Sequence, residues 1–278
     1  MSLAYASMIL GRKFGVYQKL VSSAPVLPSL LTGLVSYWNF NSQSTISSGT
    51  YAGQFGYADA TATGNTLVDA ADPQDLFNQF GDSSSAFHST GGKNGGYVDI
   101  INDSNTTGLY STLLFAKNPI SFNNQGSYSF SFWVNQDVNP AGNSLDGWLM
   151  GISSSASQPS YFGIQISSGK VVVYPNGYSG TVQNTSKNVS SAGWHNIIVS
   201  VSSGVLTTYV DGVSLSPFTI LTPTGGASCY FSLAPNVSVY TANFYGSIDE
   251  VGYWSRALTP TEAATLYNGG SGKFYPFA

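Results

Sequence analysis

The chain has 278 residues, of which only 8% are Asp, Glu, Lys or Arg, and its net charge is −4. Average soluble domains carry roughly 25% charged residues, so this composition excludes a surface of long helices with paired Glu and Lys. The nine basic residues are too few for the dense positive patch that nucleic-acid binding needs. Hydrophobic residues make up 42%, which is enough for the core of one large all-β domain.

The first 32 residues differ from the rest, and we predict an anchoring arm and linker there. This segment holds three of the nine basic residues, a pattern typical of an amphipathic helix over 6–21, and a proline-punctuated stretch at 22–28. An extended or helical arm that orders against a partner is expected, with a disordered tail as the alternative. The expected assembly contacts are Tyr5, Met8, Ile9, Arg12, Lys13, Phe14, Tyr17, Lys19 and Leu20.

The same segment lacks the order of a secretory signal, because its basic residues follow the apolar run. No stretch of the chain has the length and apolarity of a membrane span, so no membrane association is expected. Cys229 is the single cysteine, and we interpret it as a small buried hydrophobe.

From residue 33 onward, short apolar runs alternate with turns rich in Gly, Asn, Ser and Pro, which is typical of β-strands. The clearest strand has aromatic and small residues alternating with period two over 128–134. Strands are expected, in chain order, at 34–40, 97–100, 128–134, 148–152, 161–166, 170–174, 194–201, 205–210, 213–215, 229–233 and 243–254. The segment 41–96 is the least regular and holds five of the eleven Asp residues, so we interpret it as a functional connection or an insertion.

One helix is predicted near the end of the chain. Thr259 is a capping residue, Pro260 suits the first turn, and Glu262 completes a capping box. Gly269 and Gly270 end the helix. These elements together predict two antiparallel sheets packed face to face, with one short C-terminal helix.

Three motifs in order resemble laminin G-like, concanavalin A-like jelly-roll domains of the pentraxin type. GLVSYWNF at 33–40 resembles their opening strand, and GWHNIIV at 193–199 with YVDG at 209–212 resembles a pair of central strands. YGSIDEVGYWSRALT at 245–259 is similar to their closing signature. The resemblance covers roughly residues 33–272 and implies an all-β antiparallel β-sandwich domain over 33–278, with 1–32 as a separate arm.

Many members of this family carry a structural calcium ion near the sheet rim, and the resemblance makes Asp249 a candidate ligand. The loop after the first strand, 41–49, contains no Asp, although calcium takes six to eight oxygens that usually include carboxylates. No cofactor is therefore expected to be required, and calcium stays an open possibility.

Catalytic chemistry is not expected. Asp249 and Glu250 are adjacent in a strand, so we expect them on opposite faces and unable to act together as acid and base. A turn, a cap or an ion pair with Arg256 is the expected role. His195 is interpreted as a structural residue, because the sequence offers no Ser–His–Asp spacing around it.

Aromatic residues beside Gly, Ser and Asn are the remaining signal for a site. Rings next to amides suit sugar rings, although a β-sandwich core uses most of its aromatic residues. The glycan-binding candidates are Trp148, Tyr161, Tyr174 and Tyr178.

The sequence thus favours a non-enzymatic structural protein on the outer surface of a bacteriophage virion, such as a capsid decoration, head fibre or tail component. Its arm would dock onto capsid, portal or tail proteins, and its jelly roll would be displayed as a homo-oligomer for adhesion to host surface glycans or for stabilisation. A secreted or cell-surface glycan-binding module, which is an extracellular location, is the first alternative. A glycoside hydrolase of the same fold is the second.

Overall fold

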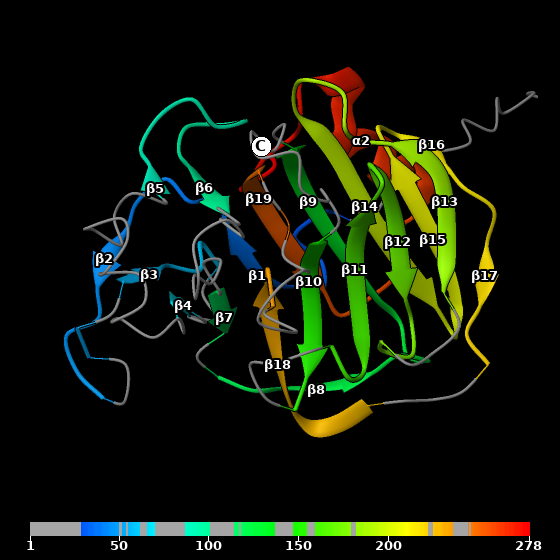
Figure 1. Ribbon diagram of the computed structural model, residues 1–278, viewed down its shortest axis with the longest axis horizontal. Coiled ribbons are helices and arrows are strands. Elements are labelled where there is room, and N and C mark those ends of the chain that lie inside the picture. Colours follow the sequence, from blue (N-terminus) through cyan, green and yellow to red (C-terminus); the bar gives the residue numbers. More distant parts are fainter. Residues whose placement is uncertain are drawn as a thin grey trace, which may run out of the picture.

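The computed structural model describes residues 29–49, 52–53, 55–61, 66–69, 87–100, 114–116, 118–136, 147–154, 159–178, 182–221, 225–235, 244 and 246–278. The nine arm residues named above lie outside this part of the chain, so the arm stays a prediction. The described residues form two antiparallel sheets and a short helix near the C-terminus (Figure 1). This arrangement confirms the predicted two-sheet β-sandwich.

The first sheet contains nine of the described strands in the order β16-β15-β14-β9-β19-β6-β5, with β1 against β19 and β17 against β15. Its strands are β1 (Leu34–Trp38), β5 (Phe87–His88), β6 (Tyr97–Ile100), β9 (Tyr128–Gln136), β14 (His195–Ser202), β15 (Val205–Val210), β16 (Val213–Ser214), β17 (Phe218–Thr219) and β19 (Gly246–Trp254).

The second sheet contains ten of the described strands in the order β13-β12-β11-β10-β18-β7-β4-β3-β2, with β8 against β18. Its strands are β2 (Ser44–Thr45), β3 (Phe55–Tyr57), β4 (Leu67–Asp69), β7 (Leu114–Ala116), β8 (Ile120–Asn123), β10 (Gly147–Ser153), β11 (Phe162–Ser167), β12 (Lys170–Tyr174), β13 (Gln183–Asn188) and β18 (Gly225–Leu233).

The main core lies between the two sheets and follows from the alternation of residues along each strand. In β9, Phe130 and Phe132 point into this core, and Phe130 stacks on Phe231 from the other sheet with ring centroids 5.8 Å apart. The small residues that alternate with them, Ser129 and Ser131, lie on the outer face, as the period of two requires. The sequence prediction for this strand is therefore confirmed.

A smaller core lies on the outer face of the nine-stranded sheet, beneath helix α2 (Pro260–Tyr267). Ile198 and Trp254 from the sheet contact Leu258, Ala263 and the rest of this cluster. The helix begins with the predicted capping box, because the Thr259 hydroxyl accepts from the Glu262 backbone and Glu262 accepts from the Thr259 backbone. A short 3-10 turn, η2 (Asn268–Gly270), follows it.

The chain just before β1 is fixed to the end of β19. Backbone carbonyls within 29–33 accept hydrogen bonds from residues 254–256. The Trp254 indole donates to Leu30 O at 2.7 Å, and the Arg256 Nε donates to Thr32 O at 2.6 Å. The last residues of the predicted linker therefore already belong to the body of the domain.

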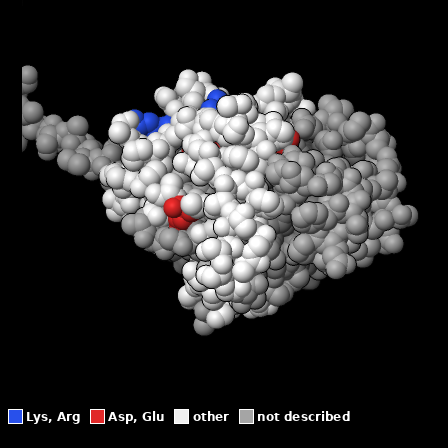
Figure 2. All heavy atoms as spheres, turned by 90° about the vertical axis from the view of Figure 1, so that its left-hand side faces the viewer, with Lys and Arg blue, Asp and Glu red and all other residues white. Residues whose placement is uncertain are grey.

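The surface is as poor in charge as the composition predicts. In Figure 2 the described part of one face carries only isolated basic and acidic side chains among uncharged residues. Several short strands in 41–96, namely β2 to β5, were not predicted, because two or three residues give no periodic pattern. Strands β7, β8, β13 and β17 were also missed.

Candidate functional site

Three of the four aromatic residues predicted to bind glycans lie together on the outer face of the ten-stranded sheet. The Trp148 ring centroid is 4.7 Å from that of Tyr174 and 6.0 Å from that of Tyr178, and the two tyrosine rings are 6.5 Å apart. Trp148 is only 1% exposed, whereas Tyr178 is 56% exposed. The tryptophan thus supports the tyrosines from below, and the tyrosines form the accessible surface. We call these three residues the tyrosine surface.

Strand register explains why these residues share a face. Trp148 of β10 lies opposite Gln165 of β11, which lies opposite Val172 of β12. Tyr174 is two residues beyond Val172, so it points to the same side. The Tyr174 hydroxyl donates to Gln165 Oε1 at 2.7 Å, which fixes the ring against the sheet. An amide group therefore lies next to the two tyrosine rings.

The fourth candidate, Tyr161, is placed differently. It is half-buried and packs against the main core, and its hydroxyl lies close to Gly226. None of the described ring contacts joins it to the tyrosine surface. A sugar-binding role for Tyr161 therefore stays a prediction.

Asp249 and Glu250 come together, although adjacent strand residues were expected to diverge. A bulge in β19 between Asp249 and Gly252, with Glu250 at φ +51°, changes the direction of the chain. Asn94 then contacts both carboxylates. Its backbone N–H donates to Asp249 Oδ2 at 3.0 Å, and its side-chain amide donates to Glu250 Oε1 at 2.9 Å. The expected opposite orientation is wrong for this reason.

Both carboxylates are buried, with 0% and 1% of Asp249 and Glu250 exposed. Burial, and then the charge of Glu250, raise the pKa of Asp249 to about 8. Burial raises the pKa of Glu250 to about 7 against the opposing effect of Tyr37 and Asn94. Arg256 does not neutralise them, because it pairs with Glu262 at 2.6 Å. These acids are therefore held inside the protein and away from a solvent-borne substrate.

The oxygens of Asp249 are already occupied by N–H donors, which leaves them poorly placed to bind calcium. Its Oδ1 accepts from the Glu250 backbone at 2.7 Å, its Oδ2 accepts from Asn94, and the Lys93 backbone also donates to it. Glu250 Oε2 is the one oxygen of the pair for which the described contacts give no hydrogen bond, although the Tyr37 hydroxyl is near enough to lower the pKa of Glu250. The described residues contain no group of three or more His, Cys, Asp and Glu side chains that could hold a metal. They do not form a calcium cage of six to eight oxygens by themselves, so calcium binding at Asp249 stays a prediction.

A hydrogen-bonded Ser–His–Asp row, which sequence reasoning missed, lies at the rim of the nine-stranded sheet. His195 Nδ1 is 2.7 Å from Asp211 Oδ2, and His195 Nε2 is 2.7 Å from Ser191 Oγ. The hydrogen bond with Asp211 raises the pKa of His195 despite partial burial. Asp211, 16 positions from the histidine, reaches it because β14 and β15 form a hairpin, whereas Ser191 reaches it from the bend just before β14. Spacing alone could not reveal this meeting.

This row lacks two parts of a nucleophilic site. None of its three residues lines the described groove, and the described contacts include no pair of N–H donors aimed at Ser191 Oγ, as an oxyanion hole requires. The Asp211 carboxylate also accepts from the Asn196 backbone at 2.9 Å, which ties the β15–β16 turn to β14. The arrangement therefore supports a structural role for His195.

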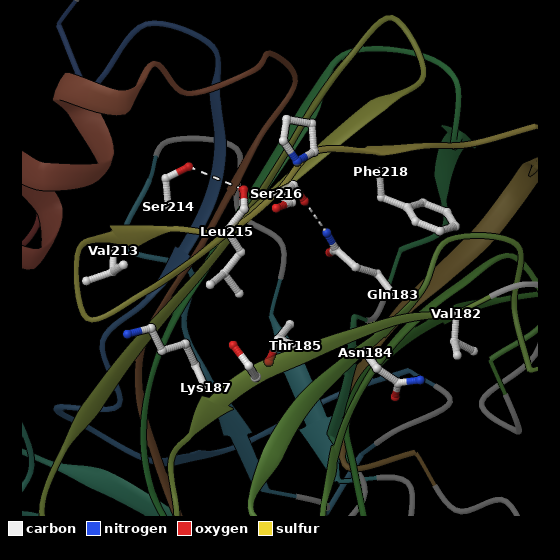
Figure 3. Close-up of a pocket in the computed structure, with 12 residues that line it drawn as sticks. Val182, Gln183, Asn184, Thr185, Lys187, Val213, Ser214, Leu215, Ser216 and Phe218 are labelled. Carbon is white, nitrogen blue, oxygen red and sulfur yellow. Dashed lines mark hydrogen bonds between the residues drawn. The ribbon is translucent and has the colours of Figure 1, made fainter.

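A groove with a volume of about 550 Å³ lies between β13 and the segment 213–218, which carries β16 and β17 (Figure 3). It is situated where the edges of the two sheets approach each other, since β13 ends one sheet and β16 ends the other. Gln183 joins the edges by donating to Ser216 O at 2.8 Å and accepting from Thr208 at 2.8 Å. Sequence reasoning missed this groove because β13 was not predicted.

Comparison with known proteins now identifies the family. The family model described as the concanavalin A-like lectin/glucanases superfamily, in its laminin G-like form, matches residues 105–264, more than half of the chain. The chain belongs to this superfamily. The predicted resemblance is thereby confirmed. A search of curated proteins finds no match to this concanavalin A-like chain.

Solved structures with the same concanavalin A-like fold are distant in sequence. The binding domain of Paraclostridial Mosquitocidal Protein 1 is 15% identical with a TM-score of 0.57, and the match covers 86% of this chain and 52% of that one. Domain 4 of AbnA, a GH43 extracellular arabinanase from Geobacillus stearothermophilus solved with arabinotriose, is 17% identical with a TM-score of 0.54 and coverages of 86% and 98%.

Trypanosoma rangeli sialidase is a third such structure, 13% identical with a TM-score of 0.55 and coverages of 88% and 35%. The chain spans about half the length of the first of these structures and about a third of the sialidase. At such identities the likeness establishes the fold alone. Among the described residues, no helix has both the length and the apolarity to cross a membrane.

Proposed function

We propose that this protein is a non-enzymatic glycan-binding module that contacts sugars through the tyrosine surface. The observation that carries the proposal is the packing of Tyr174 and Tyr178 over buried Trp148 on the outer face of the ten-stranded sheet. Aromatic rings offer flat apolar area together with a polar tip, which suits the mixed faces of a sugar ring. A ring held from below loses little freedom on binding, which favours affinity.

Polar groups in the same region complete the chemistry of such a surface. Gln165 holds the Tyr174 hydroxyl, and Asn184 lies in the next strand pair opposite Val172. Both are neutral amides, able to donate to and accept from sugar hydroxyls. The related domain 4 of the arabinanase was solved with arabinotriose, and the related toxin structure is described as a binding domain. Both relatives support a binding role.

The absence of catalysis is part of this proposal. The acidic pair of Asp249 and Glu250 is buried, and Asn94 covers both carboxylates. A glycosidase needs two carboxyl groups on either side of an accessible bond. Glu250→Gln should therefore leave any glycan binding unchanged.

Glycan binding is tested by screening the full chain on a glycan array and titrating the best oligosaccharide by calorimetry. Tyr178→Ala should weaken binding about tenfold, since losing one aromatic contact removes on the order of 1–2 kcal/mol. Tyr97→Ala is the matched control, because Tyr97 stacks on His88 on the other sheet. An empty array, or an equal loss with Tyr97→Ala, would contradict the proposal.

A second proposal is display of this module on the outer surface of a bacteriophage particle through residues 1–28. What favours it is the concentration of three of nine basic residues in the first 32, together with the fixed attachment of residues 29–33 beside β19. The partners would be capsid, portal or tail proteins and further copies of the chain. Deletion of 1–28 should abolish incorporation into particles and leave the thermal unfolding of the domain unchanged. Normal incorporation of the truncated protein would contradict it.

A further inference from the structure

The turn that joins Tyr174 to Tyr178 sets how the two rings of the tyrosine surface lie relative to each other. The Gly177 N–H donates to Tyr174 O at 3.3 Å, which closes a four-residue β-turn over 174–177. Pro175 suits the second position of such a turn, and Gly177, with φ +72°, suits the fourth. Tyr178 follows immediately, so the position of its ring depends on where this turn is held.

A buried asparagine from a distant part of the chain holds this turn. Asn124 is 0% exposed and lies between β8 and β9. Its Nδ2 donates to Pro175 O and to Asn176 Oδ1, both at 2.6 Å. A backbone carbonyl can only accept, so the nitrogen of the Asn124 amide has to face the turn. The two hydrogen bonds therefore fix the middle of the turn to a residue inside the protein.

The side chain of Asn124 is not needed to shape its own turn. Asn123 closes the link between β8 and β9, because its carbonyl accepts from the Gly126 N–H at 3.0 Å and its Oδ1 accepts from the Gln125 N–H at 3.0 Å. The amide of Asn124 is directed instead at the link between β12 and β13, where Pro175 lies 51 positions later in the chain. Its role is therefore to hold a different turn.

A second anchor holds the end of the tyrosine turn. The Tyr178 N–H donates to Pro159 O at 3.0 Å. A Cβ on Gly177 would lie 2.3 Å from Ser160 O, so the turn and residues 159–160 are in close contact. The turn is thus held by two separate parts of the chain, and neither contact uses a ring of the tyrosine surface. The rings stay available for a ligand.

We propose that Asn124 is a positioning residue for the tyrosine surface, which holds the turn so that Tyr178 lies beside Tyr174 before a sugar arrives. This inference rests on the proposed glycan-binding function. Without Asn124, the carbonyl of Pro175 would turn toward water and the Tyr178 ring would move away from its neighbour. A ring that is already in place loses less freedom on binding, so the positioning should raise the affinity about fivefold.

Amide hydrogen exchange of the full chain, followed by NMR, tests the positioning without any sugar. Asn124→Leu keeps the size of the side chain and removes its donors, so the Gly177 and Tyr178 N–H groups should exchange about tenfold faster. Asn196→Leu is the matched control, because Asn196 is also 0% exposed and donates to Phe132 O at 3.1 Å within the nine-stranded sheet. It should lower the melting temperature and leave both amides of the turn unchanged.

Calorimetric titration with the oligosaccharide that binds best on the glycan array tests the effect on binding. Asn124→Leu should weaken binding about fivefold, whereas Asn196→Leu should not. In a Tyr178→Ala background, Asn124→Leu should have no further effect, because Asn124 acts through that ring. Gly177→Ala moves the turn while Asn124 stays intact, and it should reproduce the loss even if Asn124→Leu does not fold.

The possible failures of the two proposals can be told apart. Unchanged exchange at Tyr178 in Asn124→Leu, an equal loss of affinity in Asn196→Leu, or additive effects of Asn124→Leu and Tyr178→Ala would overturn the role of Asn124 while glycan binding itself stands. No binding of any sugar by the wild type would overturn the proposed function, and the role of Asn124 in binding with it.

Discussion

Asp249 and Glu250 are neighbours in the chain and also neighbours in space, joined by one asparagine. Asn94 donates from its backbone to Asp249 and from its side chain to Glu250. Two buried carboxylates that interact electrostatically cannot both be charged without a large cost. The pair therefore behaves as a proton-binding unit inside the first sheet.

This pair makes the protein less stable as the pH rises. The pKa values of about 8 and about 7 lie above those of an unfolded chain, which are roughly 3.9 and 4.3. The folded state thus binds more protons between about pH 4 and 8, and the free energy of unfolding falls through that range. His195 acts in the same direction, because its pKa is also raised and its contribution is lost as it deprotonates. The melting temperature should be higher at pH 5.5 than at pH 8.

Glu250→Gln separates the two contributions to this pH dependence. The amide keeps the contact with Asn94, removes one charge and lowers the pKa of Asp249, so the difference between pH 5.5 and 8 should shrink. His195→Gln removes only the histidine part and serves as the control. Equal stability of the wild type at both pH values would contradict the assignment.

Calcium removal should have little effect. Both oxygens of Asp249 already accept backbone N–H groups, and only Glu250 Oε2 is left over. We expect the same melting temperature in millimolar calcium chloride and in EDTA, measured by differential scanning fluorimetry. A rise in calcium that disappears in Asp249→Asn would instead establish the calcium site that the family resemblance implies.

Gly163 has to be glycine because Trp148 occupies the space beside it. A Cβ at this position would lie 2.5 Å from the Trp148 ring and 2.9 Å from Pro159 Cβ. Gly163→Ala should therefore destabilise the fold by about 1–3 kcal/mol and shift Trp148 beneath the tyrosines, measured by urea unfolding and by tryptophan fluorescence. Gly226→Ala, in the same sheet, meets its nearest atom at 3.2 Å and should cost less.

Glu262 both pairs with Arg256 and closes the capping box with Thr259, so losing its side chain should cost more than losing the Thr259 hydroxyl alone. Glu262 is 3% exposed, and its two oxygens accept from Arg256 at 2.6 and 2.9 Å. Removing one partner of such a buried pair costs about 3 kcal/mol, so Glu262→Ala should lower the free energy of unfolding by that amount. Thr259→Ala should cost about 1 kcal/mol. A smaller loss for Glu262→Ala than for Thr259→Ala would show that solvent screens the pair.

Asp211 should control the protonation of His195 without making Ser191 reactive. Asp211→Asn should lower the pKa of His195, measured by NMR titration of the imidazole, because the leading cause of the raised value is removed. A fluorophosphonate probe, which labels reactive serines, should not label Ser191. Ser190→Ala is the control, because Ser190 is the neighbouring serine and contacts Asn188 instead of the histidine. Labelling lost in Ser191→Ala and His195→Ala would establish a nucleophile.

Local pattern predicts the regular parts of this fold well. The alternation of Phe130 and Phe132 with serines predicted β9, and the order Thr259, Pro260, Glu262 predicted the capped helix. These features depend on residues within one turn or one strand. Three of the four predicted glycan-binding candidates form the tyrosine surface, but the expectation that Trp148 is exposed is wrong, because Trp148 is 1% exposed beneath the two tyrosines.

The missed features depend on how distant strands align. The groove requires β13 and the 213–218 segment to meet across two sheets, and no sequence pattern records that meeting. The shared contact of Asp249 and Glu250 with Asn94 depends on a bulge and on a positive φ at a glutamate, which pairing rules do not anticipate. Such tertiary effects override local periodicity, so only the structure reveals them.

The hydrogen bonds that join residues 29–33 to the end of β19 determine how the domain would respond to a pulling force. Trp254 and Arg256 hold this segment, and β1 then runs antiparallel to β19, inside the nine-stranded sheet. Tension applied through residue 29 is therefore transmitted first to β19 and from there to its neighbours β9 and β6. The outer face of the other sheet, where Tyr178 is exposed, lies off this path and would keep its shape under load.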